Sequence, residues 1–146
     1  MFERVLYPTD FSDAAYRALD CIIQLQMAGT REVIVLHVVD QRDIFTMEEH
    51  TASPADIARI KQVWEDEIAR EMAAITDELT GAGLQVTQRV IYGTPFETIL
   101  QVEDEYDVSA IVLGSHGKSN IEEMLLGSVS EKVIRKSHKP VIVIKR

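Results

Sequence analysis

Apolar positions along the chain follow two alternating periods, which predict alternating strands and helices. Short runs that are apolar on both faces predict buried strands at Val5–Tyr7, Val33–Val39, Val86–Ile91, Val108–Leu113 and Val141–Ile144. Between these runs, apolar residues return every three or four positions, as in a helix. The alternation predicts an α/β fold: a doubly wound, five-stranded parallel sheet with right-handed crossovers and helices on both faces.

Capping residues mark where the predicted helices begin and end. Helix-starting residues precede the four helical segments at Ser12, Ser53–Pro54, Thr94–Pro95 and Ser128. Ser128 and Glu131 have the spacing of a capping box, so we expect Ser128 to cap the last helix. Glycines end the first two helices, at Gly29 and at Gly81 with Gly83.

One segment, Gln41–Ser53, has no clean period and is polar apart from Phe45 and Met47. We predict that it forms a long loop or irregular insertion. No second domain, internal repeat or low-complexity stretch is visible, so residues 1–146 are predicted to form a single domain.

Composition and charge argue against nucleic acids and membranes as partners. Hydrophobic residues make up 46% of the chain and charged residues 27%, as in globular domains. The net charge of −9 argues against a general affinity for nucleic-acid backbones, which requires clustered Lys and Arg. Apolar runs such as Val141–Ile144 are too short to span a membrane. The single cysteine, Cys21, and a start without a secretory signal lead us to expect a cytoplasmic protein.

Two strand ends carry unusual loops. The first strand ends in Pro8, Thr9 and Asp10, and the fourth is followed by the stretch Gly114–Ser119. In open α/β sheets, ligands bind beyond the carboxyl ends of the strands, where the strand order reverses. If these two strands are neighbours at the reversal, the two loops face one site.

The second loop has the pattern Gly114-x₂-Gly117-x₉-Gly127-Ser128. Gly114 and Gly117 would let the backbone approach a ligand with no Cβ in the way. Gly127–Ser130 would offer free N–H groups and hydroxyls at a helix N-terminus, which suits an anion. A lone glycine more often makes only a turn, but the combined spacing favours a site for a chain of phosphates.

Other phosphate and catalytic motifs are absent from the sequence. Val112 stands where a P-loop needs its first glycine, and no Gly-x-Gly-x-x-Gly occurs. The four histidines include no pair at metal-ligand spacing. His37, inside a strand, is interpreted as a core residue, and the adjacent Ser115 and His116 cannot form a triad alone.

Asp10 allows two interpretations. At the end of the first strand it could accept hydrogen bonds from ribose hydroxyls, or hold Mg²⁺ on bound phosphates. It could equally do no more than help to cap the helix that starts near Ser12. The residues alone leave both interpretations open.

Four segments together resemble the ATP-binding branch of the universal stress protein family: Val5–Ser12, Leu36–Val39, the Gly114–Ser128 pattern and Lys139–Ile144. The resemblance covers essentially the whole chain. It implies a Rossmann-like sheet of the adenine nucleotide alpha hydrolase type, with strand order 3-2-1-4-5. The first and fourth strands are then neighbours, and ATP with Mg²⁺ (or Mn²⁺) is the expected ligand.

The resemblance also implies roles for individual residues. Val38 would meet adenine through its backbone. Pro8, Thr9 and Asp10 would line the adenosine and ribose. The ribose and phosphates would be wrapped by Gly114, His116, Gly117 and Lys118. The outer phosphates would be bound by Gly127, Ser128, Val129 and Ser130.

The expected function is a nucleotide-dependent regulatory switch in a stress response. A slow ATPase or nucleotidyl-transferring enzyme is the alternative, with only His116 and Lys118 as candidate catalytic groups. A dimer module with an empty pocket is disfavoured by the intact glycine pattern. Relatives commonly form homodimers, and the apolar edge strand Val141–Ile144 predicts pairing of two copies through that edge.

Overall fold

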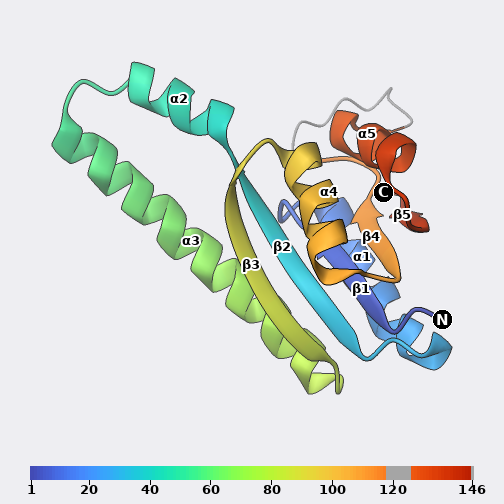
Figure 1. Ribbon diagram of the computed structural model, residues 1–146. Helices are drawn as coiled ribbons and strands as arrows, with labels where there is room; N and C mark the ends of the chain where they lie inside the picture. The colour runs from blue at the N-terminus through green and yellow to red at the C-terminus, as the bar shows by residue number, and fades with distance from the viewer. Residues whose placement is uncertain (118–125, 146) are drawn as a thin grey trace.

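The computed structural model describes residues 1–117 and 126–145 and contains a five-stranded parallel sheet with helices on both faces (Figure 1). The elements follow the order β1 (Arg4–Pro8), α1 (Asp13–Gln24), a 3₁₀ turn (Leu25–Ala28), β2 (Glu32–Asp40), α2 (Gln41–Glu49), α3 (Pro54–Gly81), β3 (Gln85–Gly93), α4 (Pro95–Tyr106), β4 (Ala110–Gly114), α5 (Ser128–Lys136) and β5 (Val141–Ile144). The strand order is β3-β2-β1-β4-β5, which confirms the predicted fold class.

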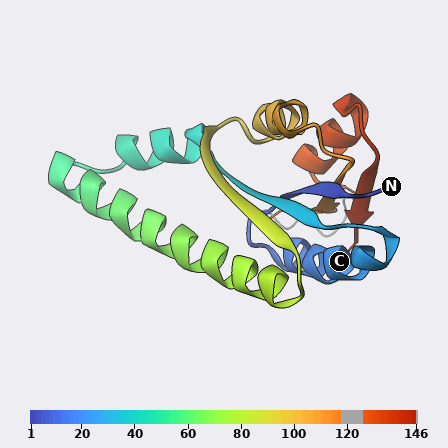
Figure 2. The same ribbon diagram turned by 60° about the horizontal axis from the view of Figure 1, so that its bottom comes forward.

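The sheet separates two apolar layers. Helices α1 and α3 cover one face, and α4 and α5 cover the other, as Figure 2 shows. Alternate residues of a strand point to opposite faces, so Val5 and Tyr7 pack toward α1 and α3 while Leu6 packs toward α4 and α5. The described part of the chain contains no helix both long and apolar enough to cross a membrane.

Strand β2 extends beyond the end of β1. Pro8, the last residue of β1, lies opposite Leu36, whereas β2 continues to Asp40 alongside β3. We call His37–Asp40 the β2 overhang. It places four residues of β2 beside the loop that follows β1.

The segment after β2 differs from its prediction as a loop, because Gln41–Glu49 forms α2. The Asp40 side chain caps this helix by accepting a hydrogen bond from the Arg42 amide (3.0 Å). Helix α2 has no fully buried residue and projects past the sheet with the start of α3 (Figure 1). Its apolar signal is short, because only Ile44 and Met47, three positions apart, are half-buried.

The start of α5 also differs from its prediction. The helix is capped by the backbone of Gly127, which accepts from the Glu131 amide (3.0 Å), and Ser128 is the first helical residue. The expected Ser128–Glu131 capping box is therefore wrong. The helix starts one residue earlier because the Gly127 amide is fixed on the end of β4, through the Ser115 carbonyl (2.6 Å).

Candidate functional site

The strand order reverses between β1 and β4, which lie side by side with Val5 opposite Ala110. The loops that follow them meet at one end of the sheet. The Ser12 hydroxyl donates to the His116 carbonyl (3.4 Å), and a Cβ on Gly117 would lie 2.7 Å from Asp10 Oδ2. The predicted meeting of the two loops is confirmed. We call Pro8–Ser12 the first loop, and Gly114–Gly117 with Gly127–Ser130 the second.

The first loop is fixed to β2 through Thr9, which is buried. The Thr9 amide donates to the Leu36 carbonyl (2.8 Å), and the Thr9 carbonyl lies 2.8 Å from His37 Nδ1. The Thr9 hydroxyl accepts from the Phe11 amide (3.1 Å). Three bonds of one residue thus determine the path of the loop.

Asp10 takes part in the start of α1, as one of its two interpretations predicts, and its role toward ribose or Mg²⁺ stays a prediction. Its Oδ1 accepts from the Ser12 amide (3.0 Å), and the Ser12 hydroxyl in turn accepts from the Ala15 amide (3.3 Å) at the start of α1. The second oxygen, Oδ2, faces Gly117 at the junction of the loops. The carboxylate therefore supports the helix start and also lies within the site.

The two halves of the second loop are brought together by backbone bonds. The Ser115 carbonyl accepts from Gly127, and the Gly114 carbonyl accepts from the Ser130 hydroxyl (2.7 Å). The N-terminus of α5 therefore lies at the end of β4, where the glycine pattern predicted it. Lys118, which the sequence also assigned to this site, lies outside the described residues.

Gly114 and Gly117 have a packing role that the sequence did not predict. A Cβ on Gly114 would lie 2.8 Å from the Ala14 Cβ and 2.9 Å from the Ala15 amide, so α1 occupies that space. The gap at Gly117 is filled by the Asp10 carboxylate. At both positions the missing Cβ allows the protein to pack closely on itself, and the expected approach of a ligand to Gly114 and Gly117 stays a prediction.

Tyr7 fixes α1 in this position. Its hydroxyl donates to the Ala15 carbonyl (2.5 Å), and burial raises the pKa of the phenol. The tyrosine therefore stays protonated and keeps its donor. This bond holds the first turn of α1 against β1. The same turn packs against Gly114 and follows the cap residue Ser12.

Fewer groups at the α5 N-terminus are open to a ligand than predicted. The Gly127 amide and the Ser130 hydroxyl both donate to backbone carbonyls of the protein. The amides of Ser128, Val129 and Ser130 belong to the first turn, where the helix supplies no acceptor four residues back. These three amides and the helix dipole form the potential anion site.

Val38 lies in the β2 overhang. The Leu36 carbonyl accepts from Thr9, so the backbone of Leu36 faces the β1 side. Backbone direction in a strand repeats every two residues, and the polar groups of Val38 therefore face the same side, past the end of β1. The structure places the Val38 backbone beside the first loop.

Catalytic chemistry has little support in the described residues. Ser115 Oγ lies 2.8 Å from His116 Nδ1, but Ser115 is fully buried and its hydroxyl is closed to a substrate. Within residues 1–117 and 126–145, no group of three or more His, Cys, Asp or Glu side chains is placed to hold a metal ion.

Sequence reasoning missed two residues of this region, Phe11 and His37. The Phe11 ring stacks on His37 with centroids 4.4 Å apart, and Phe11 has a φ of 63°. His37 is half-buried and contacts the first loop, whereas we had interpreted it as a core residue. The missing information was the β2 overhang, which depends on the pairing of three strands.

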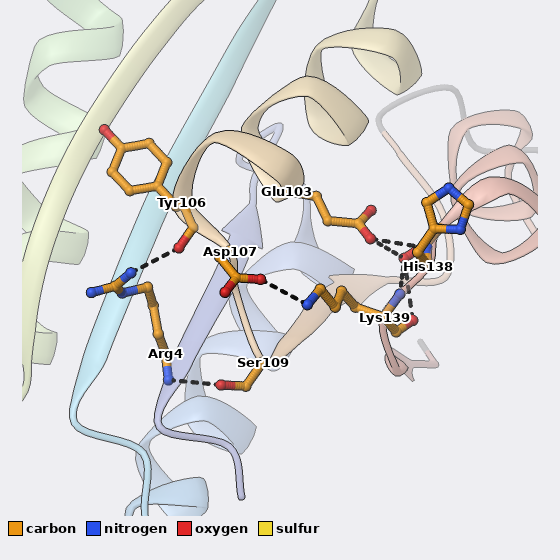
Figure 3. Close-up of polar contacts among 8 residues, drawn as sticks. Arg4, Glu103, Tyr106, Asp107, Ser109, His138 and Lys139 are labelled. Carbon is orange, nitrogen blue, oxygen red and sulfur yellow. Dashed lines mark hydrogen bonds and ion pairs between the residues drawn. The ribbon is translucent and has the colours of Figure 1, made fainter.

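A second group of charged residues lies at the opposite, amino ends of the strands (Figure 3). Glu103 is buried and accepts from the Ser137 hydroxyl (3.0 Å) and the His138 amide (2.9 Å). Lys139 pairs with Asp107 (2.9 Å), and this hydrogen bond lowers the pKa of the Asp107 carboxyl. These contacts fix the end of α4 to the turn before β5, and we interpret them as structural.

The parallel sheet, its reversal between β1 and β4, and the turn that leads into the α5 N-terminus define a doubly wound α/β protein with its candidate site at the switch point. The model of the universal stress protein family matches residues 1–145. The chain belongs to the universal stress protein family.

The chain is 38% identical to Universal stress protein MJ0577 of Methanocaldococcus jannaschii, over 100% of this chain and 96% of that protein. It superposes on the solved structure of MJ0577 with a TM-score of 0.89, covering 100% of this chain and 97% of the other at 40% identity. The likeness covers both loops of the site.

Two more distant structures share the fold. A family protein from Arabidopsis thaliana with AMP bound has a TM-score of 0.70 at 19% identity, covering 98% of this chain and 91% of that one. A universal stress protein in complex with cAMP has a TM-score of 0.64 at 24% identity, covering 99% and 97%.

Proposed function

We propose that this universal stress protein binds ATP with Mg²⁺ between its two loops, and that nucleotide occupancy acts as a regulatory switch. The observation that carries the proposal is the junction of the first loop with the α5 N-terminus at the β1–β4 reversal. The distant relatives solved with AMP and cAMP support it at the level of the fold: this architecture accommodates adenine nucleotides.

The proposed orientation follows from the chemistry of the two sides. The Val38 backbone offers one donor and one acceptor, which suits an adenine edge, and Asp10 offers a carboxylate to ribose hydroxyls. The amides of Ser128, Val129 and Ser130 offer donors and a positive helix end to phosphates. The nucleotide would therefore extend from the β2 overhang toward α5.

Magnesium would enter with the phosphates. Asp10 would supply one hard oxygen ligand, and the described residues contain no group of three or more His, Cys, Asp or Glu side chains placed to hold a metal ion by themselves. Such a site fits an ion held mainly by phosphate oxygens and water, with one protein carboxylate. Mn²⁺, which has the same preference for oxygen ligands, would be accepted there as well.

A binding role is favoured over catalysis. The buried Ser115 presents no accessible nucleophile, and the proposed donors at α5 are backbone amides, which hold phosphates without transferring protons. A slow ATPase remains the second candidate, with His116 beside the junction as its possible acid or base. Turnover well below about 10 per second is expected in either case.

Calorimetric titration of nucleotide-stripped protein tests the proposal. We expect ATP with Mg²⁺ to bind and GTP with Mg²⁺ to bind much more weakly, because the Val38 backbone contact selects the adenine edge. A phosphate-release assay on the same sample separates the binding module from the enzyme. Folded protein that binds no ATP would overturn the proposal, and rapid multiple turnover would favour the ATPase.

We also propose that two copies pair through β5, the last strand of the sheet. The Pro140 and Ile144 carbonyls accept from Ile111 and Ser115, so these alternate residues bond to β4. The backbone groups of Val141 and Val143 therefore point away from the sheet. An apolar edge with such groups is suited to antiparallel pairing about a two-fold axis.

Side-chain substitutions at Ile142 or Ile144 would disturb the core, against which both residues pack. Val143→Pro is a more selective test of the pairing, because it removes an amide that points away from the sheet and leaves the bonds to β4 intact. We expect light scattering to show a dimeric parent, a monomeric Val143→Pro variant and a dimeric Val143→Ile control. A monomeric parent at micromolar concentration would contradict this proposal and leave ATP binding unaffected.

A further inference from the structure

His37 and Phe11 form a clamp between the β2 overhang and the first loop. Their rings stack with an interplanar angle of 21°. His37 Nδ1 also lies 2.8 Å from the Thr9 carbonyl oxygen. A carbonyl oxygen can only accept, so Nδ1 carries the hydrogen and donates it. One imidazole thus supplies both a flat face and a hydrogen-bond donor to the same loop.

Phe11 has a left-handed backbone conformation, with a φ of 63°. Residues with a Cβ seldom adopt it, because the side chain crowds the backbone. Asp107 shares this conformation, but it ends α4, where left-handed residues are common. Phe11 follows a strand and precedes the cap of α1, so the loop itself must maintain the strain. Such residues persist where surrounding contacts fix them, and they gather at functional sites.

Three of the contacts that fix this loop are made by Thr9. Its amide and carbonyl are bound by Leu36 and His37, and its hydroxyl accepts from the Phe11 amide. Asp10 lies between Thr9 and Phe11 in the chain. The direction of its carboxylate therefore depends on how firmly its two neighbours are fixed.

We propose that His37 and Phe11 are positioning residues that determine ribose recognition: by fixing the first loop, they direct the Asp10 carboxylate toward the ribose hydroxyls of the nucleotide. This inference rests on the proposed ATP site. His37 of the clamp and Val38 are neighbours in β2, so one strand would place both the adenine contact and the ribose contact. A loosened clamp would leave phosphate binding at α5 in place and weaken selection of the sugar.

The two functions of His37 can be separated by substitution. His37→Phe keeps a ring to stack on Phe11 and removes the donor. His37→Asn keeps a donor at the same number of bonds from the backbone and removes the ring. His138→Phe is the matched control, since His138 is exposed at the opposite end of the strands.

The first measurement is amide hydrogen exchange of nucleotide-free protein at Phe11 and Ser12, whose amides bond to Thr9 and Asp10. We expect exchange about 10-fold faster in His37→Phe, a smaller increase in His37→Asn, and no change in His138→Phe. If His37→Phe proves unfolded, Phe11→Ala loosens the same loop while leaving the histidine donor intact. Exchange that stays at the parent rate in the folded variants would refute the clamp.

The second measurement compares the affinities for ATP, 2′-deoxy-ATP and 3′-deoxy-ATP by calorimetry. We expect the parent to prefer ATP over at least one deoxy analogue by about 10-fold, and His37→Phe to reduce that preference to about 2-fold. A purely structural role would weaken all three nucleotides equally, and that result would overturn the inference. A parent that binds none of them refutes the ATP site, and the exchange experiment still decides whether the clamp exists.

Discussion

The two loops of the site are held at the same end of the sheet by different kinds of contact. The first loop depends on side chains: the Thr9 hydroxyl, the His37 imidazole and the strained Phe11. The second depends on missing side chains, because α1 fills the gap at Gly114 and a backbone bond joins Gly127 to Ser115. Changes in the first loop should therefore alter ligand preference, while changes in the second should alter packing or phosphate binding.

The largest effect on stability is expected from a substitution at Gly114. Valine there would collide with Ala14 and Ala15 at the start of α1, so Gly114→Val should lower the free energy of unfolding by about 3 kcal/mol. The matched control is Gly81→Ala, because nothing outside its own helix backbone lies within 4 Å of the added Cβ, and its stability should change by less than about 1 kcal/mol. Urea denaturation measures both. Equal stability of the two variants would show that α1 does not depend on this contact.

A smaller effect on stability, but a clear one on binding, is expected at Gly127. An alanine Cβ would lie 3.3 Å from His116 Cα and from the Ser115 carbonyl, so the turn must shift by a few tenths of an ångström. We expect about a 10-fold loss of ATP affinity by calorimetry, because the amides of α5 move with the turn. Ser128→Ala, which keeps its amide, should lose less than about 3-fold. Full affinity in Gly127→Ala would place the phosphates elsewhere.

Asp10→Asn addresses the first loop with little effect on the fold. The amide oxygen of asparagine can still accept from the Ser12 amide, so the free energy of unfolding should change by about 0.5 kcal/mol at most. ATP affinity in the presence of Mg²⁺ should fall by about 5-fold, because the charge proposed to meet ribose and metal is lost. Unchanged affinity and unchanged sugar preference would restrict Asp10 to its role at the helix start.

The smallest expected effect is the difference in stability between Phe11→Gly and Phe11→Ala. Both variants lose the ring, but only glycine suits a φ of 63°, so Phe11→Gly should be more stable than Phe11→Ala by about 1 kcal/mol. The order should reverse at Phe45, an exposed residue of helix α2, where alanine is favoured by about 1 kcal/mol. Thermal or urea unfolding of the four variants measures the order of stability at each position. The same order at both positions would mean that Phe11 carries no backbone strain.

The sequence predicted the fold because its buried strands and amphipathic helices carry strong periods. The same reasoning failed for Gln41–Glu49, because this short helix has no fully buried residue and its apolar signal rests on Ile44 and Met47 alone. There the signal was local: Asp40 could have been recognised as the cap that receives the Arg42 amide.

The candidate site was predicted in outline, and its details depended on tertiary contacts. The reversal between β1 and β4 brings the two loops together, as the strand order from the family resemblance implied. The packing contact at Gly114 could not be predicted, since it depends on where α1 crosses β4. His37 was misinterpreted for a similar reason, because only the pairing of β1, β2 and β3 creates the overhang.

The central claim, that the two loops form one ATP site, is tested most directly by following backbone amide signals in an NMR titration with ATP and Mg²⁺. We predict that amides of Thr9–Ser12, Val38 and Ser128–Ser130 shift together and yield one dissociation constant, while those around Glu103 at the opposite end of the strands stay unchanged. Shifts confined to one loop, or different constants for the two loops, would contradict the account.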